Sequence, residues 1–142
     1  MISRIYLSII FVLFFTSTLF SQNSSIKVQV SGIDEVVGKL SIGLFKDPIG
    51  FPKKNSNNIG ITLEVTDVAM ENTFSNLEKG EYAIAIYHDE NSNGELDRNF
   101  LGMPSEDYVF SNYAKGILGP PSFEEAMFVH LDSTKINLDI NK

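Results

Sequence analysis

The segment KGEYAIAIYHD, from Lys79 to Asp89, carries the strongest strand pattern in this chain of 142 residues. After a turn at Lys79-Gly80, its side chains alternate between two faces, with Tyr82, Ile84, Ile86 and His88 on one and Ala83, Ala85 and Tyr87 on the other. A period of two is typical of a β-strand. Because the second face carries two small alanines, we expect this strand to be central in a sheet and closely covered on both faces.

Six further runs with strand character surround this segment: SIKVQVS (25–31), KLSIGLF (39–45), ITLEVTDVAM (61–70), NTFSN (72–76), AMFVHL (126–131) and KINLDI (135–140). Turn residues separate them, and Asp132-Ser133-Thr134 is typical of a hairpin turn between the last two. The pattern predicts an all-β chain, a single seven-stranded antiparallel β-sandwich of the immunoglobulin kind with one long folded connection. A small barrel is the competing architecture.

The long connection, from Asp89 to Glu124, exceeds the roughly 15 residues above which loops are functional or disordered. It is too apolar for disorder, because it contains Phe100, Leu101, Met103, Tyr108, Val109, Phe110, Tyr113, Ile117, Leu118 and Phe123. We therefore expect it to fold over the sandwich. Ser122 and Glu125 have the spacing of a capping box, which predicts one helical turn before the next strand.

The first 21 residues are typical of a secretory signal peptide. Arg4 provides a cationic start, and the apolar run 5–20 ends at Ser21-Gln22. An uncleaved anchor is the alternative, but the run is short for the roughly 20 residues that cross a bilayer. The sequence thus predicts a signal peptide over 1–21 and a β-sandwich domain over 22–142. We expect an exported protein, periplasmic or extracellular, with no membrane insertion after cleavage.

The chain is acidic, with a net charge of −7 at neutral pH. Loss of residues 1–21 would remove Arg4 and no acid, which changes this charge to −8. Such a charge argues against binding nucleic acid or anionic lipid. Six acids lie between Asp89 and Asp107 and only Arg98 opposes them. Since there is no cysteine, disulfides and thiolate metal sites are excluded.

The segment HDENSNGELD, from His88 to Asp97, has the ligand spacing of a calcium loop. Asp89, Asn91 and Asn93 occupy positions 1, 3 and 5, Glu95 position 7 and Asp97 position 9. Calcium prefers six to eight oxygen ligands, and Gly94 at position 6 allows the sharp turn. At position 7 the ligand would be the backbone carbonyl. These five residues are the predicted metal ligands, and calcium is the predicted cofactor.

The loop is not an EF-hand, because Phe100 stands at position 12 where a bidentate glutamate is needed. The missing ligand would come from elsewhere, with Glu106 the main candidate and Asp107 and Glu90 as others. The alternative is an ion-free polar turn at Asn93-Gly94.

Catalytic signals are weak. His88 and His130 have no metal-binding spacing such as H-x-H or H-E-x-x-H, and the chain has no G-x-S-x-G or phosphate-binding glycine loop. We predict that the protein is not an enzyme. The alternative is a metal-dependent hydrolase using His88, Asp89 and Glu106. Tyrosines and phenylalanines around the long connection could stack on a sugar or peptide, but core packing is their commoner role.

Several motifs together resemble the exported bacterial family called Domain of Unknown Function 2141. They are G-x-Y-A from Gly80, H-D-x-N-x-N-G-x-L-D from His88, G-x-P from Gly102, F-S-N from Phe110 and P-x-F-x-x-A from Pro121. The resemblance covers nearly all of the chain after the signal peptide. It implies a small exported domain, similar to transthyretin-like and carboxypeptidase-regulatory sandwiches, and implies no biochemical activity.

The sequence thus predicts an exported β-sandwich binding or structural module, with a calcium-binding loop that orders the long connection. Its partner would be an envelope protein, a peptide or a carbohydrate. An ion-free interaction protein of the cell envelope is a further alternative, which would use an exposed apolar patch or an edge strand.

Overall fold

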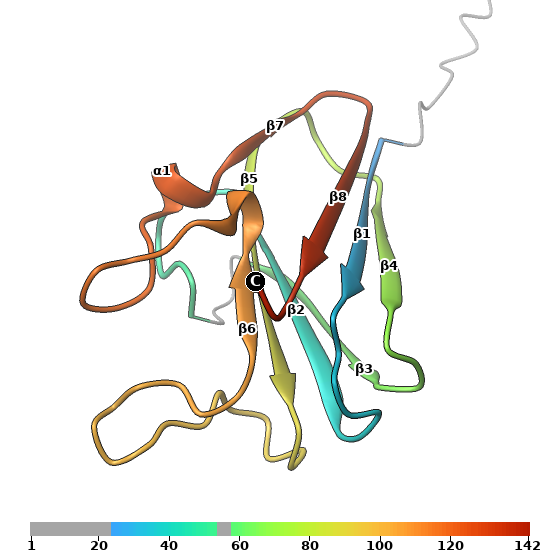
Figure 1. Ribbon diagram of the computed structural model, residues 1–142. Coiled ribbons are helices and arrows are strands. Elements are labelled where there is room, and N and C mark those ends of the chain that lie inside the picture. Colours follow the sequence, from blue (N-terminus) through green and yellow to red (C-terminus); the bar gives the residue numbers. More distant parts are fainter. Residues whose placement is uncertain (1–23, 54–57) are drawn as a thin grey trace, which may run out of the picture.

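The chain folds into two β-sheets packed face to face, as predicted (Figure 1). This computed structural model describes residues 24–53 and 58–142. The predicted signal peptide lies outside the described residues. Among those residues, no helix is long and apolar enough to cross a membrane.

The first sheet has the strand order β4-β1-β8, formed by Met70–Ser75, Ser25–Ser31 and Ser133–Asp139. The second has the order β3-β2-β5-β6, formed by Ile59–Glu64, Lys39–Phe45, Gly80–Asp89 and Tyr108–Phe110. Strand β7, Phe128–His130, pairs with the start of β5. The strand from Gly80 to Asp89 is therefore central, as its alternation predicts.

Two details of the predicted topology are wrong. The described residues contain eight strands rather than seven, because Tyr108–Phe110 adds β6 to the second sheet. In addition, β8 runs parallel to β1. The Asp132-Ser133-Thr134 segment is consequently no hairpin turn: the chain crosses there from the second sheet to the first, and the Ser25 N–H donates to the Asp132 carbonyl at 3.1 Å.

The core between the sheets follows directly from the alternation in the strands. One face of each main strand carries buried aliphatic side chains, including Ile26, Val28, Val30, Leu40, Ile42, Leu44, Ile84, Ile86 and Leu138. Burying such side chains contributes roughly 1.5–3 kcal/mol each. A small barrel is not formed, because this core is closed by two separate sheets.

A second apolar cluster lies on the outer face of the second sheet. It comprises Phe45, Ala83, Phe110, Phe123 and Ala126, with Phe51 against them. The helix α1, Phe123–Ala126, brings two members of this cluster over the sheet, and the 3₁₀-helix η1, Ser111–Tyr113, follows Phe110 directly. The capping box of α1 is present: the Ser122 hydroxyl accepts from the Glu125 N–H, and the Glu125 carboxylate accepts from the Ser122 N–H. One helical turn was predicted here and is confirmed.

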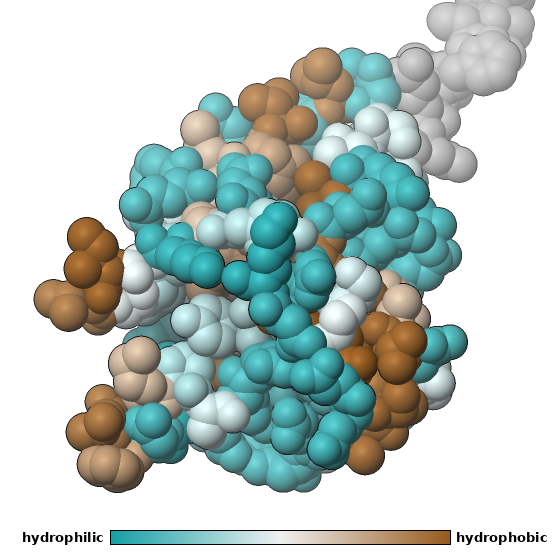
Figure 2. All heavy atoms as spheres, viewed as in Figure 1, coloured by the Kyte–Doolittle hydropathy of each residue, from teal (hydrophilic) through white to brown (hydrophobic). Residues whose placement is uncertain are grey.

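The long connection folds over the sandwich only in part. Val109, Phe110 and Phe123 are buried, but two loops project on the side away from β4 (Figure 1). Their ends carry exposed apolar side chains, with Phe100 95% and Ile117 98% exposed (Figure 2). Leu101, Met103 and Leu118 are exposed beside them. The expectation that the long connection folds over the sandwich is therefore correct for Val109, Phe110 and Phe123 and wrong for the two loop ends.

Candidate functional site

The acidic loop, residues 89–97, begins where β5 ends. Asp89 lies on the outer face of this strand, opposite to His88, and is only 1% exposed. Its two carboxylate oxygens accept hydrogen bonds from the backbone N–H groups of Asn93 at 3.0 Å and Gly94 at 2.8 Å. The loop thus turns back over the Asp89 carboxylate.

Asn91, Asn93 and Asp97 complete a connected set of side chains. The amide groups of Asn91 and Asn93 donate to the Asp97 carboxylate at 2.6 and 2.9 Å. The amide oxygen of Asn91 accepts from the Asn93 N–H, and that of Asn93 accepts from the Glu95 N–H. The four side chains predicted as ligands, those of Asp89, Asn91, Asn93 and Asp97, are therefore brought together, and Glu95, whose predicted ligand is its carbonyl, joins them through its N–H.

Glu106, the candidate extra ligand, closes the loop from the other side. It is only 8% exposed, and its two oxygens accept from the Glu90 N–H at 3.0 Å and the Asp97 N–H at 2.9 Å. Next to it in the chain, the Asp107 carbonyl accepts a hydrogen bond from the backbone N–H of His88. Glu106 therefore acts as a clamp that ties both ends of the acidic loop to the start of β6.

No protein cation neutralises this loop in the described part of the chain. The ion pairs found there lie elsewhere: Lys27–Glu71, Lys39–Glu64, Lys46–Glu78 and Lys79–Asp132. Nor do three His, Cys, Asp or Glu side chains of residues 24–53 and 58–142 form a metal-binding group. The available oxygens are two carboxylates, two amides and backbone carbonyls, which are donors that hard cations prefer and transition metals do not.

The turn over residues 32–38 holds the root of the acidic loop. His88 is 1% exposed on the core face of β5, and its Nε2 lies 2.7 Å from the Val37 carbonyl, to which it donates. Gly38 has a φ of +66°, and a Cβ there would lie 2.3 Å from the Asp89 carbonyl oxygen. Only glycine allows this close approach of the two backbones.

The two histidines do not meet. His130 is fully buried, and its ring nitrogens lie 2.7 Å from the Ser24 hydroxyl and 2.8 Å from the Thr134 hydroxyl. It thereby joins β7 to β8 and to the residue just before β1 in the other sheet. The three residues of the alternative hydrolase hypothesis, His88, Asp89 and Glu106, do not form a catalytic group either. The His88 side chain faces the core, and both carboxylates accept hydrogen bonds from backbone N–H groups.

The sequence did not predict a groove of about 630 Å³ on the outer face of the second sheet. Its floor contains Gly43, Gly60 and Ala85, and one end is formed by Gly94, Glu95, Leu96 and Arg98 of the loop that follows β5. The available signal was the presence of three small residues at outward positions of three strands. The Tyr87 hydroxyl, which donates to the Gly94 carbonyl at 3.0 Å, joins the groove to the acidic loop.

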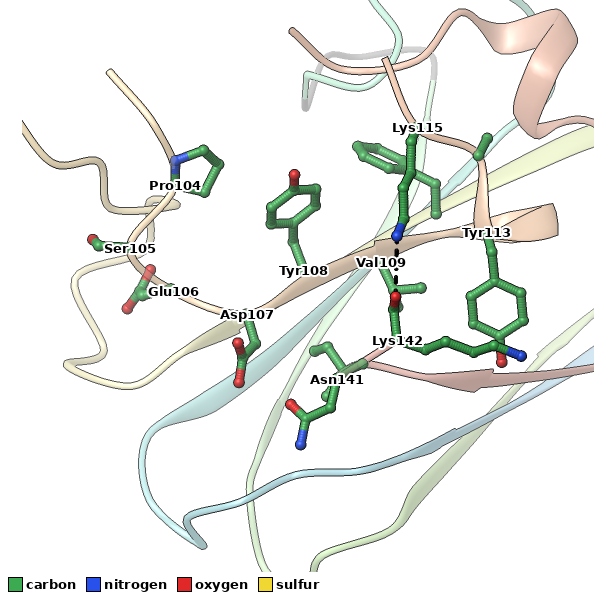
Figure 3. Close-up of a pocket in the computed structure, with 13 residues that line it drawn as sticks. Pro104, Ser105, Glu106, Asp107, Tyr108, Val109, Tyr113, Lys115, Asn141 and Lys142 are labelled. Carbon is green, nitrogen blue, oxygen red and sulfur yellow. Dashed lines mark hydrogen bonds between the residues drawn. The ribbon is translucent and has the colours of Figure 1, made fainter. Parts of the chain in front are cut away.

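A second hollow of about 390 Å³ lies between β6 and the last residues of the chain (Figure 3). Lys115 Nζ donates to the Lys142 carbonyl at 3.1 Å across it, and Lys142 Nζ lies 4.7 Å from the centre of the Tyr113 ring. Asp107 adds a carboxylate to the same wall. This hollow therefore contains charges of both signs, some of which already contact other groups of the protein. Such a mixture does not indicate one class of ligand.

The shifted pKa values lie away from the acidic loop. A hydrogen bond between Lys46 and Glu78 raises the pKa of the lysine and lowers that of the glutamate. Burial raises the pKa of Tyr82, whose hydroxyl donates to the Glu78 carbonyl at 2.9 Å. These shifts come from contacts near the ends of strands and do not mark a general acid or base in the acidic loop.

The chain matches one of the known protein families over most of its length. The family model described as "Uncharacterized protein conserved in bacteria (DUF2141)" matches residues 28–137. No curated protein and no solved structure matches the chain.

Proposed function

The chain belongs to the DUF2141 family of uncharacterised bacterial proteins, and we propose that it is an exported binding module whose acidic loop takes up calcium. The observation that carries the calcium proposal is the buried Asp89 carboxylate, which has no cation beside it among the described residues and faces a loop rich in oxygen. A buried carboxylate without a counter-charge is costly. A divalent cation would supply that charge.

The loop has the oxygens for such an ion. Each oxygen of Asp89, Asn91 and Asn93 that accepts one N–H keeps a further lone pair. On binding the ion, the Asp97 carboxylate would give up the hydrogen bonds that it accepts from the amide groups of Asn91 and Asn93 and would coordinate the cation instead. The Glu95 carbonyl would provide a fifth oxygen and water the remaining ones. In this proposal Glu106 stays a clamp and is not a ligand.

The role of the ion would be to order the loop that leads to β6. With two carboxylates and two neutral amides, we expect a dissociation constant on the order of 0.1–1 mM, as in extracellular modules. At a tenfold excess of calcium the folded state would gain about 1.4 kcal/mol. For a domain of this size that corresponds to a rise in melting temperature of roughly 5 °C.

The test is thermal unfolding of the purified protein in calcium, in magnesium and in chelator. We expect calcium alone to raise the melting temperature. Asp97→Asn should abolish the rise, whereas Glu81→Gln, which removes one exposed acid from β5, should keep it. Equal melting temperatures with calcium and with chelator would show that the loop is an ion-free turn.

Export is the second part of the proposal and rests on the apolar run 5–20 after Arg4. Intact-mass measurement of the protein recovered from the periplasm or medium should give a chain that begins near Gln22. Recovery of the full-length chain from the cytoplasm alone would contradict it.

An ion-free envelope interaction protein has one observation in its favour, the exposed apolar ends of the two projecting loops (Figure 2). Large apolar side chains such as Phe100 and Ile117 are costly to hold in water and mark contact sites. Replacing both with serine should leave the melting temperature unchanged in this case and weaken association with the envelope fraction equally in calcium and in chelator.

A further inference from the structure

Across the outer face of the second sheet runs a row of positions that hold only glycine or alanine. In the register of the sheet, Gly43 lies opposite Gly60 on one side and Ala85 on the other, and Ala85 lies opposite Phe110. The row therefore runs across β3, β2 and β5 and ends against a phenylalanine on β6. Its length is three strand spacings, about 14 Å. We call this feature the trough.

Packing explains one of the two glycines but not the other. A Cβ on Gly43 would lie 2.8 Å from the Phe45 ring, so this glycine makes room for a core aromatic. A Cβ on Gly60 would meet nothing closer than 3.8 Å. Gly60 weakens an edge strand and fills no structural need. Its effect is to keep the trough open at one end.

One wall of the trough is a row of four hydroxyl groups. Ser41 lies opposite Thr62 and Tyr87, and Tyr87 lies opposite Tyr108, so the four residues form the next outward row of the same strands. In the part of the chain that the structure describes, the hydroxyls of Ser41, Thr62 and Tyr108 have no hydrogen-bond partner. Each can donate one hydrogen bond and accept others.

The other wall is apolar and rigid. It consists of Phe45 and Pro52, and Phe110 closes the end. The Phe51 ring holds these aromatics in place, with its centre 5.1 Å from that of Phe45 and 5.8 Å from that of Phe110. Phe45 and Phe110 are only 3% and 8% exposed, so little of either ring faces the trough, whereas the Tyr108 ring on the hydroxyl wall is 44% exposed. The trough thus offers a narrow apolar wall on one side and an exposed aromatic ring with free hydroxyls on the other, within a volume of about 630 Å³ that is typical of small-ligand sites.

We propose that the trough binds a neutral oligosaccharide. A sugar ring has apolar C–H faces that pack on aromatic side chains, and hydroxyls around its rim that exchange hydrogen bonds with other hydroxyls. The two walls present these two kinds of group side by side. The proposal rests on the proposed binding function and names its ligand class.

The charges favour a neutral ligand. Glu95, Arg98 and Lys53 line the trough and have both signs, while the chain carries a net charge of −7. An anionic polysaccharide would be repelled by the whole protein. A peptide is disfavoured for a different reason. Extended peptides pair with the free backbone of an edge strand, and the trough has such an edge only at its β3 end, because the backbone of β2 and β5 beneath it is paired on both sides.

The experiment is titration of the purified protein with maltohexaose, cellohexaose, xylohexaose and chitohexaose, followed by tyrosine fluorescence and calorimetry. A hexagalacturonate serves as the anionic comparison and an extended hexapeptide as the peptide comparison. We expect saturable binding of at least one neutral sugar. Binding of none of them at concentrations up to about 10 mM, or binding of only the anionic sugar or only the peptide, would overturn the proposal.

Variants then locate the site. Gly60→Leu places a side chain in the trough without a clash, and Thr62→Val removes one wall hydroxyl. We expect Gly60→Leu to weaken sugar binding at least about tenfold without lowering the melting temperature, and Thr62→Val to weaken it less. Thr73→Val on β4, an exposed edge-strand threonine of the other sheet, is the matched control and should bind normally. Sugar binding unaffected by Gly60→Leu would overturn the assignment.

The two proposals can fail separately. If calcium leaves the melting temperature unchanged but Gly60→Leu abolishes sugar binding, the calcium loop is wrong and the trough stands. If calcium stabilises the protein but no neutral sugar binds, the trough is wrong and the calcium loop stands.

Discussion

The Tyr87 hydroxyl donates a hydrogen bond to the Gly94 carbonyl at 3.0 Å, and this contact connects the trough to the acidic loop. Tyr87 belongs to the rigid strand β5, whereas Gly94 lies in the exposed loop after it. Gly94 is therefore held to β5 at two points, by this hydrogen bond and by its own N–H, which donates to the Asp89 carboxylate at 2.8 Å.

We expect Tyr87→Phe to lower the free energy of unfolding by about 0.5–1.5 kcal/mol, because it removes this single hydrogen bond. Urea denaturation measures the change. Tyr108→Phe is the matched control, since the Tyr108 hydroxyl has no partner among the described residues, and it should leave stability unchanged. Equal losses in the two variants would show that the Tyr87 contact does not hold the loop.

Glu106→Gln tests the clamp at the root of the acidic loop. The amide can accept from only one of the two N–H groups that the carboxylate now satisfies, those of Glu90 and Asp97. We expect a loss of about 1–3 kcal/mol in the free energy of unfolding and faster hydrogen exchange at both N–H groups.

The same variant separates a clamp from a ligand. If Glu106 only clamps, calcium should still raise the melting temperature of Glu106→Gln. If Glu106 coordinates the ion, the rise should disappear as it does in Asp97→Asn. The exposed Glu124→Gln controls for the loss of one negative charge.

Gly38→Ala tests the contact between the 32–38 turn and the loop root. A Cβ at Gly38 would lie 2.3 Å from the Asp89 carbonyl oxygen, which is backbone and cannot give way easily. We expect a loss of at least about 2 kcal/mol in the free energy of unfolding, of which 1–2 is the cost of a left-handed non-glycine residue. Gly102→Ala carries only that cost, because its φ is +78° and nothing lies within 4 Å. Equal losses of unfolding free energy in the two variants would show that a Cβ at position 38 does not clash with the Asp89 carbonyl.

His130 illustrates how a histidine that looks like a candidate ligand is used for structure. Its two ring nitrogens form hydrogen bonds with the hydroxyls of Ser24 and Thr134, and its ring packs edge-on against Tyr82. Thr134→Val would leave a buried ring nitrogen without a partner, so we expect a loss of about 1–3 kcal/mol in the free energy of unfolding. Thr73→Val on exposed β4 should cost far less, and an equal cost would contradict this role.

Local patterns predicted the parts of the fold that depend on neighbouring residues. The alternation around Tyr82 and Ile84 placed β5 at the centre of a sheet, and the Ser122–Glu125 spacing predicted the helical turn of α1. The spacing of Asp89, Asn91, Asn93 and Asp97 likewise anticipated that their side chains gather. In each case the pattern that carried the prediction spans no more than about ten residues of sequence.

Features that depend on pairing between distant strands were not predictable in the same way. The parallel pairing of β1 with β8 joins Ser25 to Ser133, and no local signal specifies a partner so far away. The trough depends on the register that sets Gly43 between Gly60 and Ala85. The exposure of Phe100 and Ile117 depends on whether a loop folds back, which hydrophobicity alone does not decide.

Glu71 on β4 provides a test of the electrostatics between strands. Its carboxylate accepts from Lys27 Nζ and Gln29 Nε2, each at 2.9 Å, and these hydrogen bonds, the one from Lys27 foremost, hold its pKa below the ordinary value of 4.5. Because the pKa is lower in the folded state, the ionised carboxylate stabilises the fold above pH 4.5. That stabilisation is lost as the pH falls through the lowered pKa.

We therefore expect Glu71→Gln to lower the urea midpoint slightly near about pH 7 and to match the parent protein near about pH 2. The effect should be small and should shrink in high salt, because all three side chains are exposed to solvent. Glu81→Gln removes the same charge from an exposed position on β5 and should show no such dependence on pH. A difference that grows as the pH falls would mean that the contact with Lys27 and Gln29 does not stabilise the ionised form, because protonation of Glu71 must abolish any advantage that its charge provides.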